Sequence, residues 1–180
     1  MRYKTHLATT FAVALPIMDS AQALTVSGVA LLAIGTVFPD IDEPNSYIGH
    51  RMKGVSGGIN GLFGHRGLTH SLLGLVAISY LFYLLASWIS FPVELIQWFS
   101  FGYLAHLVED SFSRKGIAWL QPISKKRFQS GFEIFYYSTG GLVEQVVFFA
   151  SILAILYHLS QLQLSDVSFT YLNRLVHQYF

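Results

Sequence analysis

Residues 65–71, His-Arg-Gly-Leu-Thr-His-Ser, bring two imidazoles, one guanidinium and two hydroxyls into one short stretch. Imidazole nitrogen is a good ligand for zinc and related metals. The guanidinium of Arg66 cannot bind a cation, but it can hold a phosphate group through two hydrogen bonds. His65 and His70 are five residues apart, so a turn at Gly67 is needed to bring them together. The stretch indicates a metal site that faces a phosphate.

Two further polar clusters have spacings that suit metal ligation. Asp40 and Asp42 follow Pro39, and in an extended segment their carboxylates point to the same side. His106 and Asp110 are four residues apart, which makes them neighbours on one face of a helix. Ordinary alternatives remain, because an Asp-Ile-Asp string occurs in many turns and a His–Asp pair can be a simple helical ion pair.

The composition is that of an integral membrane protein. Of the 180 residues, 53% are hydrophobic and 12% are charged, against about 25% charged residues in a soluble domain. The length suits one domain over residues 1–180. A net charge of +1 creates no overall field for nucleic acid, so no nucleic-acid partner is expected. Without cysteine, a metal must be held by histidines, carboxylates or backbone oxygens, and such sites suit zinc, manganese or iron.

Apolar runs predict about five helices, the first of them short: residues 7–18, 21–38, 72–91, 93–110 and 141–162. A membrane-crossing helix needs roughly 20 apolar residues, so the last four runs are predicted to span a bilayer. The segments between them at 43–64 and 111–140 are predicted to be polar loops, and the tail beyond residue 162 is moderately amphipathic. The sequence thus predicts an all-α, polytopic membrane helix bundle.

The first run allows two interpretations. Residues 1–4 are basic and the string Ala21-Gln22-Ala23 matches a cleavage site, as in a secretory signal peptide. Alternatively, the run stays in the protein as a short helix that forms a hairpin with residues 21–38. If it is cleaved, His6 is lost from any site.

The distribution of basic residues predicts the orientation. With a cytoplasmic N-terminus, all of the eleven Lys and Arg residues except Arg174 fall in the three inside segments, 1–5, 39–71 and 111–140. Cytoplasmic loops carry this excess of positive charge. The protein is therefore predicted to be a multi-pass membrane protein with its N-terminus on the cytoplasmic side.

This topology brings eight ionisable side chains to one depth, at the cytoplasmic ends of the helices: His6, Asp40, Asp42, His65, His70, His106, Asp110 and Glu144. Charged groups at membrane depth are costly and tend to mark function. A shared cation would offset that cost, so we predict that these eight residues are metal ligands. Taken singly, each has a simpler explanation, for example a helix-start charge at Glu144 that the helix dipole favours.

The strings Phe-Pro-Asp-Ile-Asp-Glu-Pro-Asn-Ser at 38–46, Gly-His-Arg-Gly-Leu-Thr-His-Ser at 64–71 and Gly-Tyr-Leu-Ala-His at 102–106, with Asp110, resemble the YdjM family. That family is described as inner-membrane-associated, metal-dependent hydrolases. It is distantly similar to the zinc-dependent phospholipase C and single-strand nuclease enzymes. Glu43 stands where the family often has histidine, and residues 113–115 stand where it often has Thr-Pro.

The resemblance implies a hydrolase that carries one to three divalent ions, with zinc as the first choice and manganese or iron as alternatives. Asp40 or Asp42 would bridge the ions or orient the attacking water, and Arg66 would stabilise charge on the phosphoryl group. A site at headgroup depth in the lipid bilayer suggests a phosphoester in a lipid or lipid-linked substrate.

Other functions fit parts of the pattern. A metal-bound hydroxide also hydrolyses esters and amides. A metal or proton transporter would use buried His and Asp side chains, but residues 73–85 and 148–156 contain no Asp, Glu, Lys, Arg or His, which argues against a path across the membrane. A non-catalytic membrane protein with a structural metal site is the third alternative.

Overall fold

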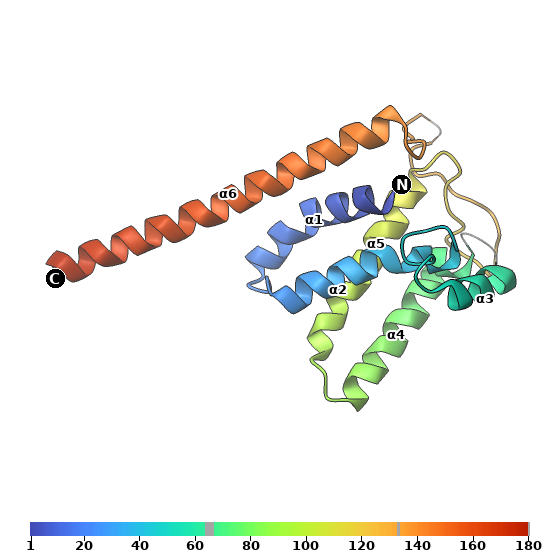
Figure 1. Ribbon diagram of the computed structural model, residues 1–180, viewed down its shortest axis with the longest axis horizontal. Coiled ribbons are helices and arrows are strands. Elements are labelled where there is room, and N and C mark those ends of the chain that lie inside the picture. The colour runs from blue at the N-terminus through green and yellow to red at the C-terminus, as the bar shows by residue number, and fades with distance from the viewer. Residues whose placement is uncertain (64–66, 133, 180) are drawn as a thin grey trace.

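The computed structural model describes residues 1–63, 67–132 and 134–179, and its named elements are helices joined by loops (Figure 1). In chain order its elements are α1 (Tyr3–Ser20), α2 (Val26–Val37), the 3₁₀ turn η1 (Phe38–Asp42), α3 (Lys53–Phe63), η2 (Leu68–His70), α4 (Leu72–Trp88), η3 (Val93–Leu95), α5 (Ile96–Ser111) and α6 (Leu142–Tyr179). Within those ranges there is no strand, and two isolated β-bridges lie in the segment between α5 and α6. The all-α prediction is confirmed.

Helices α2 and α5 form the centre of the fold because two glycines let their backbones touch. A Cβ atom on Gly35 would lie 2.0 Å from the carbonyl oxygen of Phe99, and one on Gly102 would lie 2.3 Å from that of Leu32. The side chains of Leu32, Phe99 and Tyr103 fill the surrounding core and are at most 1% exposed. This close approach places the end of α2 beside the second half of α5.

We expect Gly35→Ala to destabilise the protein by about 1–3 kcal/mol, because the added methyl group forces α2 and α5 apart. The measurement is the thermal unfolding midpoint of the purified protein in detergent. Gly57→Ala is the matched control, since a Cβ atom there meets nothing within 4 Å and alanine favours a helix by roughly 1 kcal/mol over glycine. Equal midpoints for the two variants would contradict the close packing of α2 on α5.

The other helices surround this pair. Helix α1 packs against α2 and α6, and α4 packs against α5, as Figure 1 shows. The side-chain oxygen of Ser71 accepts a hydrogen bond from the backbone N–H of Gly74 at 3.1 Å and so caps the start of α4. A Cβ atom on Gly74 would lie 2.1 Å from the carbonyl oxygen of Leu68. This contact folds η2 back onto α4 and turns His70 toward α5.

The segment 43–64, predicted as a polar loop, contains helix α3. Its glycines have low helix propensity, but a tertiary contact outweighs that preference: the side chain of Asn60 donates a hydrogen bond to the backbone carbonyl of Asp42 at 2.7 Å. Helix α6 is also longer than predicted, since it continues to Tyr179 rather than ending near residue 162.

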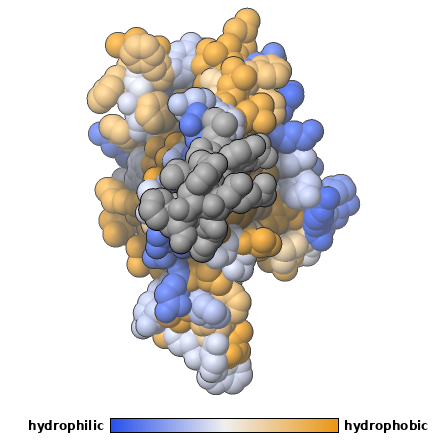
Figure 2. Space-filling model, turned by 90° about the vertical axis from the view of Figure 1, so that its left-hand side faces the viewer, coloured by the Kyte–Doolittle hydropathy of each residue, from blue (hydrophilic) through white to orange (hydrophobic). Residues whose placement is uncertain are grey.

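Of the described helices, Leu142–Leu162 within α6 is long and apolar enough to cross a membrane, while the apolar helix Leu72–Trp88 is shorter. Large apolar side chains point outward from both, including Val76 at 62%, Tyr80 at 60%, Phe149 at 63% and Leu153 at 67% exposure. Hydrophobic residues also cover much of the described surface in Figure 2. Such extended apolar surfaces mark contact with a membrane or a partner.

Candidate metal centre

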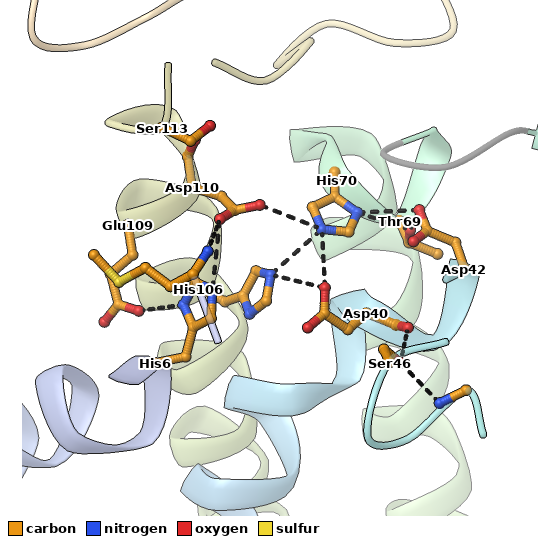
Figure 3. A network of polar contacts seen from close by, with 12 residues as sticks. His6, Asp40, Asp42, Ser46, Thr69, His70, His106, Glu109, Asp110 and Ser113 are labelled. Atoms are coloured by element: carbon orange, nitrogen blue, oxygen red, sulfur yellow. Dashed lines mark hydrogen bonds and ion pairs between the residues drawn. The ribbon is translucent and has the colours of Figure 1, made fainter. Parts of the chain in front are cut away.

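Five of the eight predicted ligands meet where α1, η1, η2 and α5 converge (Figure 3). The first turn of α1 supplies His6, η1 supplies Asp40, η2 supplies His70, and adjacent turns of α5 supply His106 and Asp110. The three imidazoles and the Asp110 carboxylate are buried, whereas the Asp40 side chain retains 20% exposure. The cluster is therefore closed on the side of the helices and open beside Asp40.

The inward-facing atoms lie within metal-binding reach of one another. The Nε2 atoms of His70 and His106 are 3.3 Å apart, and each is 3.7 Å from Oδ1 of Asp40. Oδ2 of Asp110 is 3.8 Å from Nε2 of His70, and Oδ1 is 3.5 Å from Nε2 of His6. Among the described residues, two sets of three can hold an ion, His6 with His106 and Asp110, and Asp40 with His70 and His106. His106 belongs to both sets.

The outward-facing Nδ1 atom of each imidazole contacts an acceptor. Nδ1 of His70 is 3.1 Å from Oδ2 of Asp42. Nδ1 of His106 is 2.7 Å from the backbone carbonyl oxygen of Thr36, and Nδ1 of His6 contacts the Glu109 carboxylate. A carbonyl or carboxylate accepts a hydrogen bond from Nδ1–H, so the neutral ring directs its Nε2 lone pair into the cluster. Metal-ligating histidines are held in this way.

This donor set fits a cation. The Nε2 atoms of His70 and His106 lie 3.3 Å apart, with carboxylates from Asp40 and Asp110 beside them. Buried carboxylates are costly unless a positive charge lies between them. A divalent ion bound by nitrogen and oxygen atoms meets that requirement, and imidazole with carboxylate is a ligand set that zinc accepts.

The charges around His70 and Asp40 support each other. Burial lowers the pKa of His70, but hydrogen bonds and Coulomb attraction from Asp40 and Asp42 outweigh it and raise the pKa to about 9. Burial raises the pKa of Asp40, but His106 and His70 outweigh it and lower the pKa to about 2. Without a metal ion, the cluster therefore retains a proton on His70 at neutral pH.

Asp42 lies behind His70 rather than in either set of three residues (Figure 3). Its Oδ2 accepts hydrogen bonds from the hydroxyl of Thr69 at 2.5 Å and from the backbone N–H of Gly67 at 3.3 Å, besides its contact with Nδ1 of His70. The carboxylate thus ties η2 to η1 and fixes the orientation of the imidazole. Its predicted role as a ligand that bridges ions or orients water stays a prediction.

Glu144, also predicted as a ligand, joins two helix ends instead. It accepts hydrogen bonds from the backbone N–H groups of Arg2 at 2.6 Å and Gly140 at 2.5 Å, and from the hydroxyl of Thr5 at 2.9 Å. A carboxylate at a helix N-terminus is favoured by unpaired N–H groups and the helix dipole. Glu144 therefore holds α6 against the start of α1, which carries His6.

Sequence reasoning missed Glu109, which contacts His6 and accepts a hydrogen bond from the hydroxyl of Thr10 at 3.1 Å. Its position three residues after His106, on the same helical face, is a signal that could have identified it. Thr36 acts through its backbone carbonyl, for which the residue type gives no signal.

His65 and Arg66 lie outside the described residues, so their predicted roles in metal and phosphate binding stay predictions.

Comparison with known proteins places the chain in a family. The family described as YdjM inner membrane protein matches residues 1–166. The inner membrane proteins YdjM of Escherichia coli (strain K12) and Shigella flexneri are each 41% identical over 88 residues, which is 48% of this chain and 44% of theirs. The chain thus spans less than half the length of these two relatives.

A third relative covers more of the chain. The uncharacterised protein YvsG of Bacillus subtilis (strain 168) is 31% identical over 126 residues, which is 70% of this chain and 74% of YvsG. No solved structure matches. Because the family match extends over residues 1–166 and includes every residue of the cluster, the chain belongs to the YdjM family of inner membrane proteins.

Proposed function

We propose that this protein is a membrane-bound, metal-dependent hydrolase that cleaves a phosphoester in a lipid or lipid-linked substrate. The observation that carries the proposal is the orientation of the three buried imidazoles. Each has Nδ1 against an acceptor and belongs to a cluster with the carboxylates of Asp40 and Asp110. Histidines that bind a metal typically have their other ring nitrogen hydrogen-bonded in this way.

Some residues of the cluster would bind the metal, and others orient the residues that bind it. His106 would hold an ion either with His6 and Asp110 or with Asp40 and His70, because its single Nε2 lone pair binds one ion at a time. Bound there, a divalent ion such as zinc lowers the pKa of a water ligand toward neutrality and neutralises phosphate oxygens. Asp42, Glu109 and the Thr36 carbonyl keep the imidazoles in the required tautomer. The Asp40 side chain, at 20% exposure, is the most accessible of the five groups in the cluster.

The proposed setting is the inner membrane, with several helices in the bilayer and the N-terminus and metal centre on the cytoplasmic side. The exposed apolar faces of α4 and α6 support it. So does the basic character of the segments beside the cluster, because cytoplasmic loops are rich in Lys and Arg. A centre at this depth is within reach of lipid headgroups.

The test is an assay of the detergent-solubilised protein against phospholipids and lipid pyrophosphates, with and without a chelator. We expect turnover that the chelator and His70→Ala both abolish. His158→Ala, the matched control, should keep full activity, because Nε2 of His158 lies near Asp19 at 3.8 Å and not in the cluster. Turnover that resists both the chelator and His70→Ala would rule out metal-dependent hydrolysis at this site.

A further inference from the structure

A cationic cavity opens beside the metal centre, in the segment that connects α5 to α6. Its volume is about 610 Å³, and the charged side chains that line it within the described residues are Arg114, Lys115 and Arg127. Ser138 and Thr139 are among the other residues that line it. A pocket with this lining suits a phosphate, because guanidinium groups bind phosphate through paired hydrogen bonds.

The shape of the connecting segment holds the basic residues together. Gly116 has φ +58°, and a Cβ atom on it would lie 2.3 Å from the carbonyl oxygen of Phe128. Ile117 and Phe128 exchange two backbone hydrogen bonds, at 3.2 Å and 2.8 Å. This pairing ties the backbone next to Arg127 to the backbone that follows residues 114 and 115, and all three basic side chains line the cavity.

The wall of the cavity contacts the metal centre directly. The buried phenol of Tyr137 donates a hydrogen bond to Oδ1 of Asp110 at 2.7 Å, and the hydroxyl of Ser113 donates one to the backbone carbonyl of Asp110 at 2.7 Å. The backbone N–H of Arg114 donates to the carbonyl of Tyr137 at 3.1 Å. An anion in the cavity is thus separated from a predicted ligand by one side chain.

An apolar groove begins at the same tyrosine. A cavity of about 450 Å³ is lined by Tyr137 with Phe112, Phe135 and Val143. Val108 and Glu109 line both this cavity and a third one of about 310 Å³ between α1 and α5. The two cavities therefore adjoin each other, and the first shares Tyr137 with the cationic cavity.

We propose that the cationic cavity binds the phosphate head of a lipid phosphate, and that the hydrocarbon chain of the same molecule lies in the apolar groove beyond Tyr137. The inference goes beyond the proposed hydrolase function, because Tyr137 lies between the cavity and Asp110 and the phosphate held there is not the one at the metal centre. Positive charge at one end and an apolar groove at the other match an amphiphile with a phosphate head. Membrane orientation alone requires basic residues in the segment, but it does not require them to line one cavity next to Asp110.

The experiment measures binding of dioctanoyl phosphatidic acid and of inorganic phosphate to the full chain, purified in detergent and loaded with zinc. We expect Arg114→Gln and Arg127→Gln each to weaken binding of the phosphatidic acid by about tenfold, the usual effect of losing a charged hydrogen bond. Lys125→Gln and Lys126→Gln are matched controls. They remove the same charge from the same segment without touching the cavity lining, and we expect less than about a twofold change.

The groove has its own pair of variants. Val143 lines it and is 52% exposed, whereas Val146, one helical turn away and 58% exposed, does not line it. We expect Val143→Gln to weaken binding of phosphatidic acid but not of inorganic phosphate, and Val146→Gln to change neither.

The outcomes separate the two proposals. Equal losses in the arginine and lysine variants would overturn the phosphate pocket, since only the general field of the segment would then matter. Equal affinity for inorganic phosphate and phosphatidic acid would overturn the chain groove. Selective binding of phosphatidic acid by a protein that hydrolyses no lipid phosphate would support the pocket and groove while removing the hydrolase function. The zinc content of Arg127→Gln should equal that of the wild type. The loss of phosphatidic acid binding then does not come from a loss of metal.

Discussion

Replacing His106 by alanine is expected to remove metal from the whole centre. His106 is the residue common to both sets of ligands, and its Nε2 lies 3.3 Å from that of His70 and 3.7 Å from Oδ1 of Asp40. An ion held by either set would lose one of three protein ligands, so we expect affinity to fall by more than the 10–100-fold that outer-shell changes cause. The measurement is zinc content of the purified protein, by elemental analysis after dialysis.

Two matched variants make this result specific. Asp42→Asn leaves both sets of three residues in place. It removes the carboxylate that contacts Nδ1 of His70, so we expect a smaller loss of about 10–100-fold in affinity. His158→Ala removes an imidazole that lies near Asp19 instead and should leave the zinc content unchanged. Full zinc content in His106→Ala would show that the cluster does not bind the metal.

The sequence predicts the helices better than it predicts their boundaries. Apolar runs identified the regions of α1, α2, α4, α5 and α6, because hydrophobic composition is a property of the residues themselves. Helix α3 was missed because Gly57 and its neighbouring glycines favour a loop. What stabilises α3 is a contact between Asn60 and the backbone of Asp42, and such a contact can be seen only after the chain has folded.

The sequence identified the types of residue in the site better than it identified which of them face the cluster and which contact the histidines from behind. His106 and Asp110 lie on one face of α5, and His70 lies at the end of η2. The fold brings these three residues together. Sequence spacing cannot tell which carboxylate faces Nε2 and which faces Nδ1, because that depends on how η1 meets η2. Asp42 and Glu109 therefore differ from Asp40 and Asp110 in position, although all four are acidic residues close to a histidine in space.

The second large effect that we expect is a steep pH dependence of metal affinity. In the metal-free protein the pKa of His70 is raised to about 9, so an incoming ion must displace a proton at any lower pH. Each pH unit below 9 then weakens the apparent affinity by about tenfold, because the metal-competent form becomes about tenfold rarer. The measurement is a zinc titration of the full chain against a competing chelator of known pH dependence, between pH 6.5 and 9.

The same shift has an opposite consequence for the metal-free fold. A histidine whose folded pKa exceeds its unfolded value stabilises the protein below the unfolded value, and this contribution disappears as the pH rises through the folded pKa. For His70 that window runs from 6.5 to about 9. The metal-free protein should therefore lose thermal stability across this range, whereas zinc affinity increases over the same range. Affinity that stays flat between pH 7 and 9 would mean that His70 is already neutral at pH 7, with its proton no longer held by Asp40 and Asp42.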